Sequence, residues 1–92
     1  MAAETLTLSE ITNIAGVAGL QATLSERIQA ADGELLVVDC SEVRTIDAAS
    51  LQCLLMARRQ AKKAGGDLQL RPVSEDFERY VDSVGLRIHL LN

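Results

Sequence analysis

Apolar and polar positions follow two different periods along the chain, and a fully apolar run of four residues stands between segments of these two kinds. This run, residues 35–38, is followed directly by Asp39 and then by a short polar loop. Such a run is typical of a strand in the middle of a parallel sheet, buried on both of its faces. Open α/β sheets place ligand and partner sites beyond the carboxyl ends of their strands. We therefore expect any functional surface to involve the loop that follows.

Strands are predicted where apolar and polar residues alternate or where a short apolar run is bounded by turn residues. Four segments fit this description: residues 5–8, 11–14, 34–40 and 67–71. Pro72 has no amide hydrogen for a ladder and is expected to close the last of them. The hydrophobic residues 86–91 are expected to form either a short edge strand or packed coil.

Helices are predicted where apolar residues recur at spacings of three and four. Three segments show this spacing: residues 16–31, 47–64 and 75–84. Asp47 and Ser74 carry side-chain oxygens that suit the N-caps of the second and third helices. A glycine follows each helix closely, as expected of a helix end.

The resulting order, β-β-α-β-α-β-α, predicts a single α/β domain over residues 1–92. We expect a four- to five-stranded mixed sheet with helices mainly on one face, because a chain this short cannot supply two full helical layers. The other face of the sheet is then partly exposed.

Composition narrows the classes of partner. The only aromatic residues are Phe77 and Tyr80, so the core is aliphatic and base stacking is disfavoured. A net charge of −4 also disfavours a surface that tracks nucleic-acid phosphates. The one basic cluster, formed by Arg58, Arg59, Lys62 and Lys63, is interpreted as the solvated end of the second helix, where cations suit the helix dipole.

Cys40 and Cys53 lie in apolar surroundings without metal-ligand spacing. A disulfide between them is conceivable, but free thiols in a cytosolic protein are favoured. No signal segment is recognisable, and no apolar stretch reaches the roughly 18–20 residues that span a bilayer. We expect a cytoplasmic protein without direct membrane insertion, and the sequence leaves its oligomeric state open.

Enzyme signatures are missing. His89 has no neighbouring nucleophile or carboxylate to pair with, and residues 16–19 fit neither a P-loop nor a dinucleotide-binding turn. Asp39 and Asp47 lack a third ligand for a metal, so capping and loop hydrogen bonds are the favoured interpretation. We expect no enzymatic activity, no cofactor and no metal.

The second helix has two apolar faces in its first half. Leu51, Leu54 and Leu55 form the core stripe, whereas Ala49, Cys53 and Met56 form a second stripe that continues to Gln60. This second stripe either packs against a neighbouring helix or forms a flat, uncharged docking patch for a protein. A methionine in such a patch can adapt to a partner.

Residues 36–51, Leu-Val-Val-Asp-Cys-Ser-Glu-Val-Arg-Thr-Ile-Asp-Ala-Ala-Ser-Leu, resemble the motif of the STAS domain, the anti-sigma factor antagonist fold. That motif is an apolar strand, Asp-Leu-Ser, an apolar anchor and then Asp-Ser-Ser-Gly-Leu. The order of elements is similar across nearly the whole chain, including Gly65-Gly66 and the Val-Gly-Leu that ends the last helix. The resemblance implies a regulator that acts by protein–protein binding.

In that family a partner kinase phosphorylates the serine or threonine just before the motif glycine. Matched residue by residue, Asp47 is the motif acid, Ala48 and Ala49 take the two hydroxyl positions, and Ser50 takes the glycine position. Ala49 has no oxygen to phosphorylate. Ser50 lies about 100° further around the helix, so its phosphorylation is the lesser alternative.

The resemblance implies a surface made of Asp47, Ala48, Ala49, Ser50, Cys53 and Met56. Its partner would be an anti-sigma-type serine kinase or a chemotaxis signalling component, since Leu51-Gln52-Cys53-Leu54-Leu55 also resembles chemotaxis-associated STAS proteins. The alternative is the STAS subunit of a lipid-trafficking ABC transporter, which docks on its ATPase. A small-molecule role ranks behind both.

Overall fold

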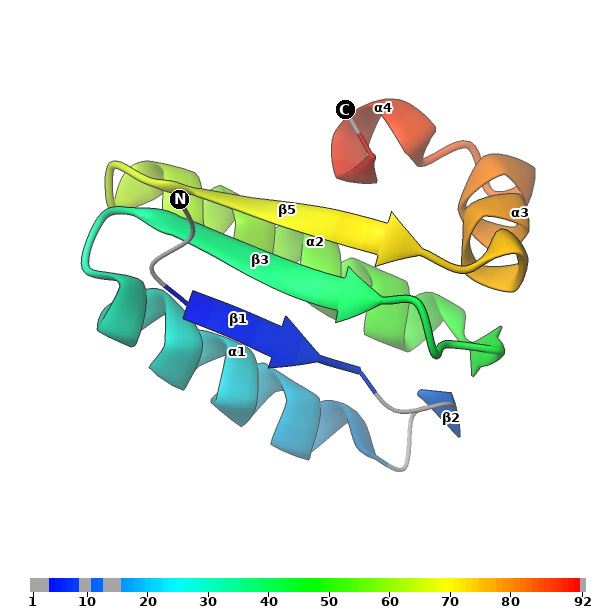
Figure 1. The fold of residues 1–92 in the computed structure, drawn as a ribbon, viewed down its shortest axis with the longest axis horizontal. Coiled ribbons are helices and arrows are strands. Elements are labelled where there is room, and N and C mark those ends of the chain that lie inside the picture. Colours follow the sequence, from blue (N-terminus) through cyan, green and yellow to red (C-terminus); the bar gives the residue numbers. More distant parts are fainter. Residues whose placement is uncertain (1–3, 9–10, 13–15, 92) are drawn as a thin grey trace.

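The computed structural model describes residues 4–8, 11–12 and 16–91, and a three-stranded parallel sheet lies at its centre. The strands are β1 (Glu4–Thr7), β3 (Leu35–Cys40) and β5 (Asp67–Val73), in the order β1-β3-β5 (Figure 1). The apolar run of β3 therefore occupies the middle position, as predicted. A separate parallel pair joins the two-residue strands β2 (Ile11–Thr12) and β4 (Thr45–Ile46).

The sheet differs from the expected four- to five-stranded mixed sheet. Neighbouring segments β1 and β2 do not form a hairpin; instead β1 pairs in parallel with β3, and β2 pairs in parallel with β4. Helical crossovers join the strands of the main sheet, which leaves every pair among the described residues parallel. The predicted strand 11–14 is described only at residues 11–12, and the rest of it lies outside the described residues.

Two long helices, α1 (Val17–Ala31) and α2 (Ala48–Lys63), lie side by side on one face of the sheet (Figure 1). This confirms the prediction that helices cover mainly one face. The third helix, α3 (Glu75–Ser83), follows β5 directly. Asp47 and Ser74 are the N-caps of α2 and α3, as predicted, and their side chains accept hydrogen bonds from backbone amides three residues later.

The tail of the chain was expected as an edge strand or coil, but it forms the short helix α4 (Arg87–Leu90). Gly85 adopts a positive φ of 74°, which turns the chain after α3 and allows the amide of Leu86 to bond the carbonyl of Val81. One side of the following helical turn then buries Leu90 in the core.

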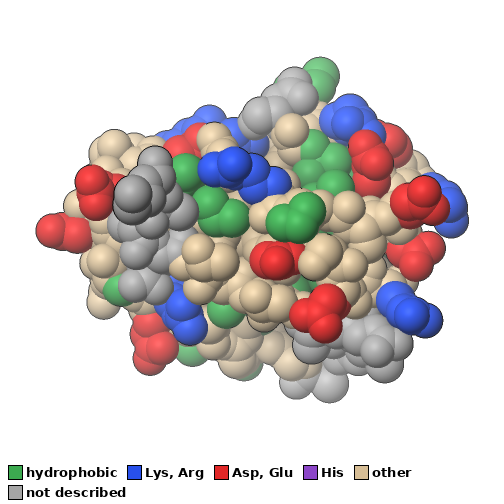
Figure 2. Space-filling model, in the orientation of Figure 1, with side chains coloured by type: hydrophobic (Ala, Val, Ile, Leu, Met, Phe, Trp, Pro, Cys, Tyr) green, Lys and Arg blue, Asp and Glu red, His purple; other side chains and the backbone are tan. Residues whose placement is uncertain are grey.

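Burial along β3 alternates, which corrects the expectation of a strand buried on both faces. The side chains of Leu36, Val38 and Cys40 are inaccessible, whereas Leu35 and Val37 on the opposite face are only half-buried. The cause is the absence of a helical layer over that face among the described residues. Figure 2 shows this face, where hydrophobic side chains lie among charged ones.

The strand β5 is two residues longer than predicted. It continues through Pro72 to Val73, with a register shift opposite β3 between Val38 and Cys40. Because β5 lies at an edge of the sheet, the missing amide hydrogen of Pro72 interrupts no second ladder.

A groove between the two long helices

The start of α2 is positioned by a network of loop hydrogen bonds at the carboxyl end of β3. The Asp47 carboxylate accepts from the amide of Ser50 at 2.9 Å, and Asp39 accepts from the amide and hydroxyl of Ser41 at 2.9 and 2.6 Å. Both Ser41 bonds hold the pKa of Asp39 below its ordinary value. Capping and loop bonding thus account for both aspartates, and no group of metal-ligating side chains is found in the described part of the chain.

The loop between β3 and α2 is also anchored from beneath. Val43, the apolar residue of the loop, is inaccessible to solvent, and its carbonyl accepts a hydrogen bond from the Ser74 hydroxyl. The Ser74 amide in turn bonds the carbonyl of Cys40. The two caps and the end of β3 therefore hold the start of α2 in one orientation.

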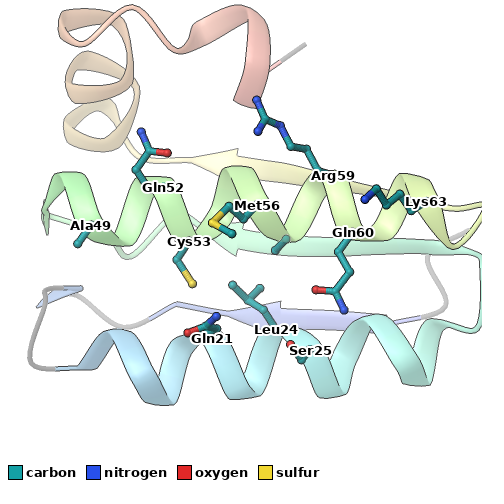
Figure 3. Close-up of a pocket in the computed structure, with 11 residues that line it drawn as sticks. Gln21, Leu24, Ser25, Ala49, Gln52, Cys53, Met56, Arg59, Gln60 and Lys63 are labelled. Carbon is teal, nitrogen blue, oxygen red and sulfur yellow. The ribbon is translucent and has the colours of Figure 1, made fainter.

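The second apolar stripe of α2 faces a groove between α1 and α2, which we call the helix groove (Figure 3). Its apolar part consists of Leu24, Ala49, Cys53, Met56 and Ala57. Its polar part consists of Gln21, Ser25, Gln52, Arg59, Gln60 and Lys63. The volume is about 450 Å³.

The structure shows packing against α1 for part of this stripe and exposure for another part. Cys53 points toward α1 and is half-buried between the helices, as packing against a neighbour requires (Figure 3). Met56 is 61% exposed at the rim of the groove, and Val84 and Ile88 are the other large apolar side chains exposed among the described residues. The stripe therefore contributes both to the wall of the groove and to its exposed rim.

The predicted surface residues separate into three environments. Ala49, Cys53 and Met56 line the helix groove, while Ala48 is exposed in the first turn beside it. Asp47 is half-buried and caps the helix. Ser50 has 0% exposure. Its predicted place on the docking surface is therefore wrong, because the residue after Ala49 is turned toward the core of the domain.

The α1 side of the groove was not anticipated. Gln21 and Ser25 are polar residues next to the buried stripe of α1, and nothing local marks them as part of a site. Their spacing of four places them on one helix face, but only the packing of α1 against α2 makes that face a wall of the groove.

The basic cluster is only partly the solvated helix end that was expected. Arg59, Lys62 and Lys63 are exposed, but Arg58 is only 9% exposed. The guanidinium of Arg58 donates to the Asp67 carboxylate at 3.2 Å and to the His89 carbonyl at 2.9 Å. These two bonds satisfy the buried charge and join α2 to β5 and α4.

The cysteines are free, as predicted. Cys40 is fully buried, and burial, followed by the charge of Asp39, raises its pKa to about 12. Burial also raises the pKa of Cys53. Both thiols are therefore protonated near neutral pH and lack the thiolate that a nucleophile needs.

Comparison with known proteins agrees with this geometry. The family model described as Mlab, STAS domain, matches residues 1–92. The chain belongs to the STAS family. STAS domains are generally binding domains without enzymatic activity, and they typically mediate protein–protein interactions. No curated protein matches the chain. Within the described residues of this STAS domain, no helix has the length and apolar character to cross a membrane.

Ser50 is unusual in this STAS domain because its buried hydroxyl has no hydrogen-bond partner among the described residues. Replacing Ser50 by alanine is expected to raise the free energy of unfolding by about 1 kcal/mol, since an unsatisfied buried hydroxyl is costly and alanine favours the helix. Urea denaturation measures this difference. Ser25→Ala, in the interior of α1, is the matched control for helix propensity. A gain no larger than that of the control would show that the buried hydroxyl costs nothing.

Proposed function

We propose that this STAS domain is a cytosolic bacterial regulator that binds a protein partner at the start of α2 and along the helix groove. The observation that carries the proposal is the second apolar stripe of α2. Ala49, Cys53 and Met56 line one groove, and the 61% exposure of Met56 is not explained by the core. Exposed apolar surface rimmed by polar residues is typical of protein-binding sites.

The proposed partner is an anti-sigma-type serine kinase or a chemotaxis signalling component. The resemblance of residues 36–51 to the anti-sigma factor antagonist motif supports the first, and Leu51-Gln52-Cys53-Leu54-Leu55 supports the second. In either case the loop 41–44 and the first turn of α2 are held rigidly by Asp39, Asp47 and Ser74. A preformed surface of this kind binds with little ordering cost.

A glutamate at position 49 is expected to weaken partner binding at least tenfold, because it places an uncompensated charge in an apolar contact. The variant should remain folded, since an anion in the first turn of α2 suits the helix dipole and no acid occupies that turn. The measurement is capture of the partner from the native cell extract by immobilised wild type and by Ala49→Glu. Ala30→Glu, an exposed site on α1 away from the groove, is the matched control. Equal capture by all three proteins would place the binding surface elsewhere.

Binding is proposed to be independent of phosphorylation at the motif. Ala48 and Ala49 carry no hydroxyl, and Ser50 is buried behind the first turn of α2. Incubation with a cognate kinase and ATP, followed by intact-mass measurement, is expected to show the unmodified mass. One phosphate per chain would contradict this, and peptide mapping would then decide whether Ser50 becomes accessible.

The alternative function is that of a STAS subunit in a lipid-trafficking ABC transporter, docked on the ATPase subunit. The same surface at the start of α2 would make that contact. Co-purification with an ATPase from solubilised membranes, lost in Ala49→Glu, would favour the transporter over the cytosolic regulator.

A further inference from the structure

The charge of α2 differs from that of the rest of the chain. Helix α2 carries four cations and no acid, whereas the whole protein has a net charge of −4. One of the four, Arg58, is largely buried and donates hydrogen bonds within the fold to the Asp67 carboxylate and the His89 carbonyl. The other three, Arg59, Lys62 and Lys63, are exposed in the second half of the helix.

The lining of the helix groove changes from apolar to basic along the axis of α2. Its beginning is apolar around Ala49 and Cys53, Met56 stands at the middle, and Lys63 lies at the far end. Arg59 lines this half of the groove too, with its guanidinium directed away from α1 toward α4 (Figure 3). Among the eleven described residues that line it, none is acidic. From position 49 to position 63 the groove follows about 21 Å of helix, at roughly 1.5 Å per residue.

We infer that the occupant of this groove is an acidic amphipathic helix of the partner protein, with apolar side chains against Cys53 and Met56 and carboxylates at Arg59 and Lys63. The inference rests on the proposed function and specifies the chemistry of its partner. A groove between two packed helices suits a third helix, whose apolar ridge fits between them. Charge complementarity at one end fixes its direction and register.

The described surface disfavours the other occupants. A second copy of this chain would offer the acidic helix α3, but Arg87 already pairs with Glu78 and Asp82 there, and Arg79 pairs with Asp76. A bilayer presents a flat surface, whereas this site is a groove between two helices. Single-stranded nucleic acid would require aromatic residues for stacking, and none lines the groove.

Two synthetic 15-residue peptides test the inference. Both carry leucines at positions i, i+4 and i+7 of one helical face; the first has glutamates and the second lysines on the flanking positions. Chemical shifts of ¹⁵N-labelled full chain are followed during titration. The glutamate peptide is expected to bind at least tenfold more tightly than the lysine peptide and to shift the amides of Leu24 and Cys53. Equal affinities, or no shifts at these residues, would overturn the inference.

The charged end of the groove is tested by the double variant Arg59→Glu/Lys63→Glu, which should lose the preference for the glutamate peptide. Lys62→Glu, on the same helix but outside the groove, is the control and should keep it. Vesicles of phosphatidylglycerol provide a further arm. Shifts of the groove amides by vesicles, without shifts by the glutamate peptide, would replace the helix with a lipid surface and overturn the inference.

Capture of the native partner separates this inference from the proposed function. If Ala49→Glu loses the partner while Arg59→Glu/Lys63→Glu retains it, the docking surface is correct but the inference of an acidic partner helix is wrong. If both variants retain the partner, the proposed docking surface itself is wrong. Loss by both variants, with retention by Lys62→Glu, is the expected result.

Discussion

Replacing Leu54 by alanine is expected to lower the free energy of unfolding by about 3–5 kcal/mol. Leu54 lies on the core face of α2 and has 0% exposure. Its truncation removes apolar contacts and leaves a cavity between α2 and the sheet, where the packed neighbours can collapse only in part. A domain of this size has a total stability of about 5–14 kcal/mol, so the loss is a large fraction of it. Urea denaturation with a fixed m-value measures the change.

Met56 supplies the control within the same helix. Met56→Ala also truncates a large apolar residue, yet the side chain is 61% exposed, so stability should change by less than about 0.5 kcal/mol. The two variants together separate the core stripe from the groove stripe. Similar losses in both would mean that Met56 is buried in solution, and the second stripe would then be part of the core.

Replacing Arg58 by alanine is expected to lower the free energy of unfolding by about 2–3 kcal/mol, because one partner of a largely buried ion pair is removed. The Asp67 carboxylate loses its guanidinium partner at 3.2 Å, and the His89 carbonyl loses a donor at 2.9 Å. Asp67 keeps partial contact with water, so the loss stays below that of a fully buried pair. Arg59→Ala, the exposed neighbour, should leave stability nearly unchanged.

The difference between wild type and Arg58→Ala should also depend on pH. In the wild type, burial raises the pKa of Asp67, but the Arg58 and Leu68 hydrogen bonds and the charges of Arg58 and Lys62 outweigh it and lower the pKa. A lowered carboxyl pKa contributes stability above the ordinary value of about 4, and this contribution is lost as the pH falls through the folded pKa. In Arg58→Ala the hydrogen bond and the charge of Arg58 are gone, so only burial, the Leu68 hydrogen bond and the charge of Lys62 still act on the pKa of Asp67.

The stability gap between the two proteins is therefore expected to be wide near neutral pH and to narrow in acid, below about pH 4. Urea midpoints measured across this pH range give the result. A gap that stays constant would show that the guanidinium contributes through packing and the His89 carbonyl alone, without a charge interaction with Asp67.

The local elements could be predicted because their causes are local. The N-caps Asp47 and Ser74 bond amides only three residues away, and the apolar spacing of α2 reports its two faces directly. The docking stripe of Ala49, Cys53 and Met56 was predicted for the same reason. Its assignment as a binding surface remains a proposal that the variants above test.

Contacts between residues distant in sequence were not predictable in this way. Strand pairing depends on which segments meet in space, so β2 joined β4 instead of forming a hairpin with β1. The resemblance to the motif placed Ser50 on the predicted docking surface, but only the tertiary packing decided that its hydroxyl is buried without a partner among the described residues.

The sequence by itself determined the α/β class, the helix starts, the middle position of the apolar strand and the resemblance to STAS domains, because each depends on neighbours within a few residues. The tertiary structure alone decided the α1 wall of the helix groove and the burial of Arg58. The latter requires a carbonyl 31 residues away to reach the guanidinium, and no local pattern encodes that approach. The apolar strand β3 and the loop after it lead to the start of α2, and the proposed partner binds in the helix groove beside α2.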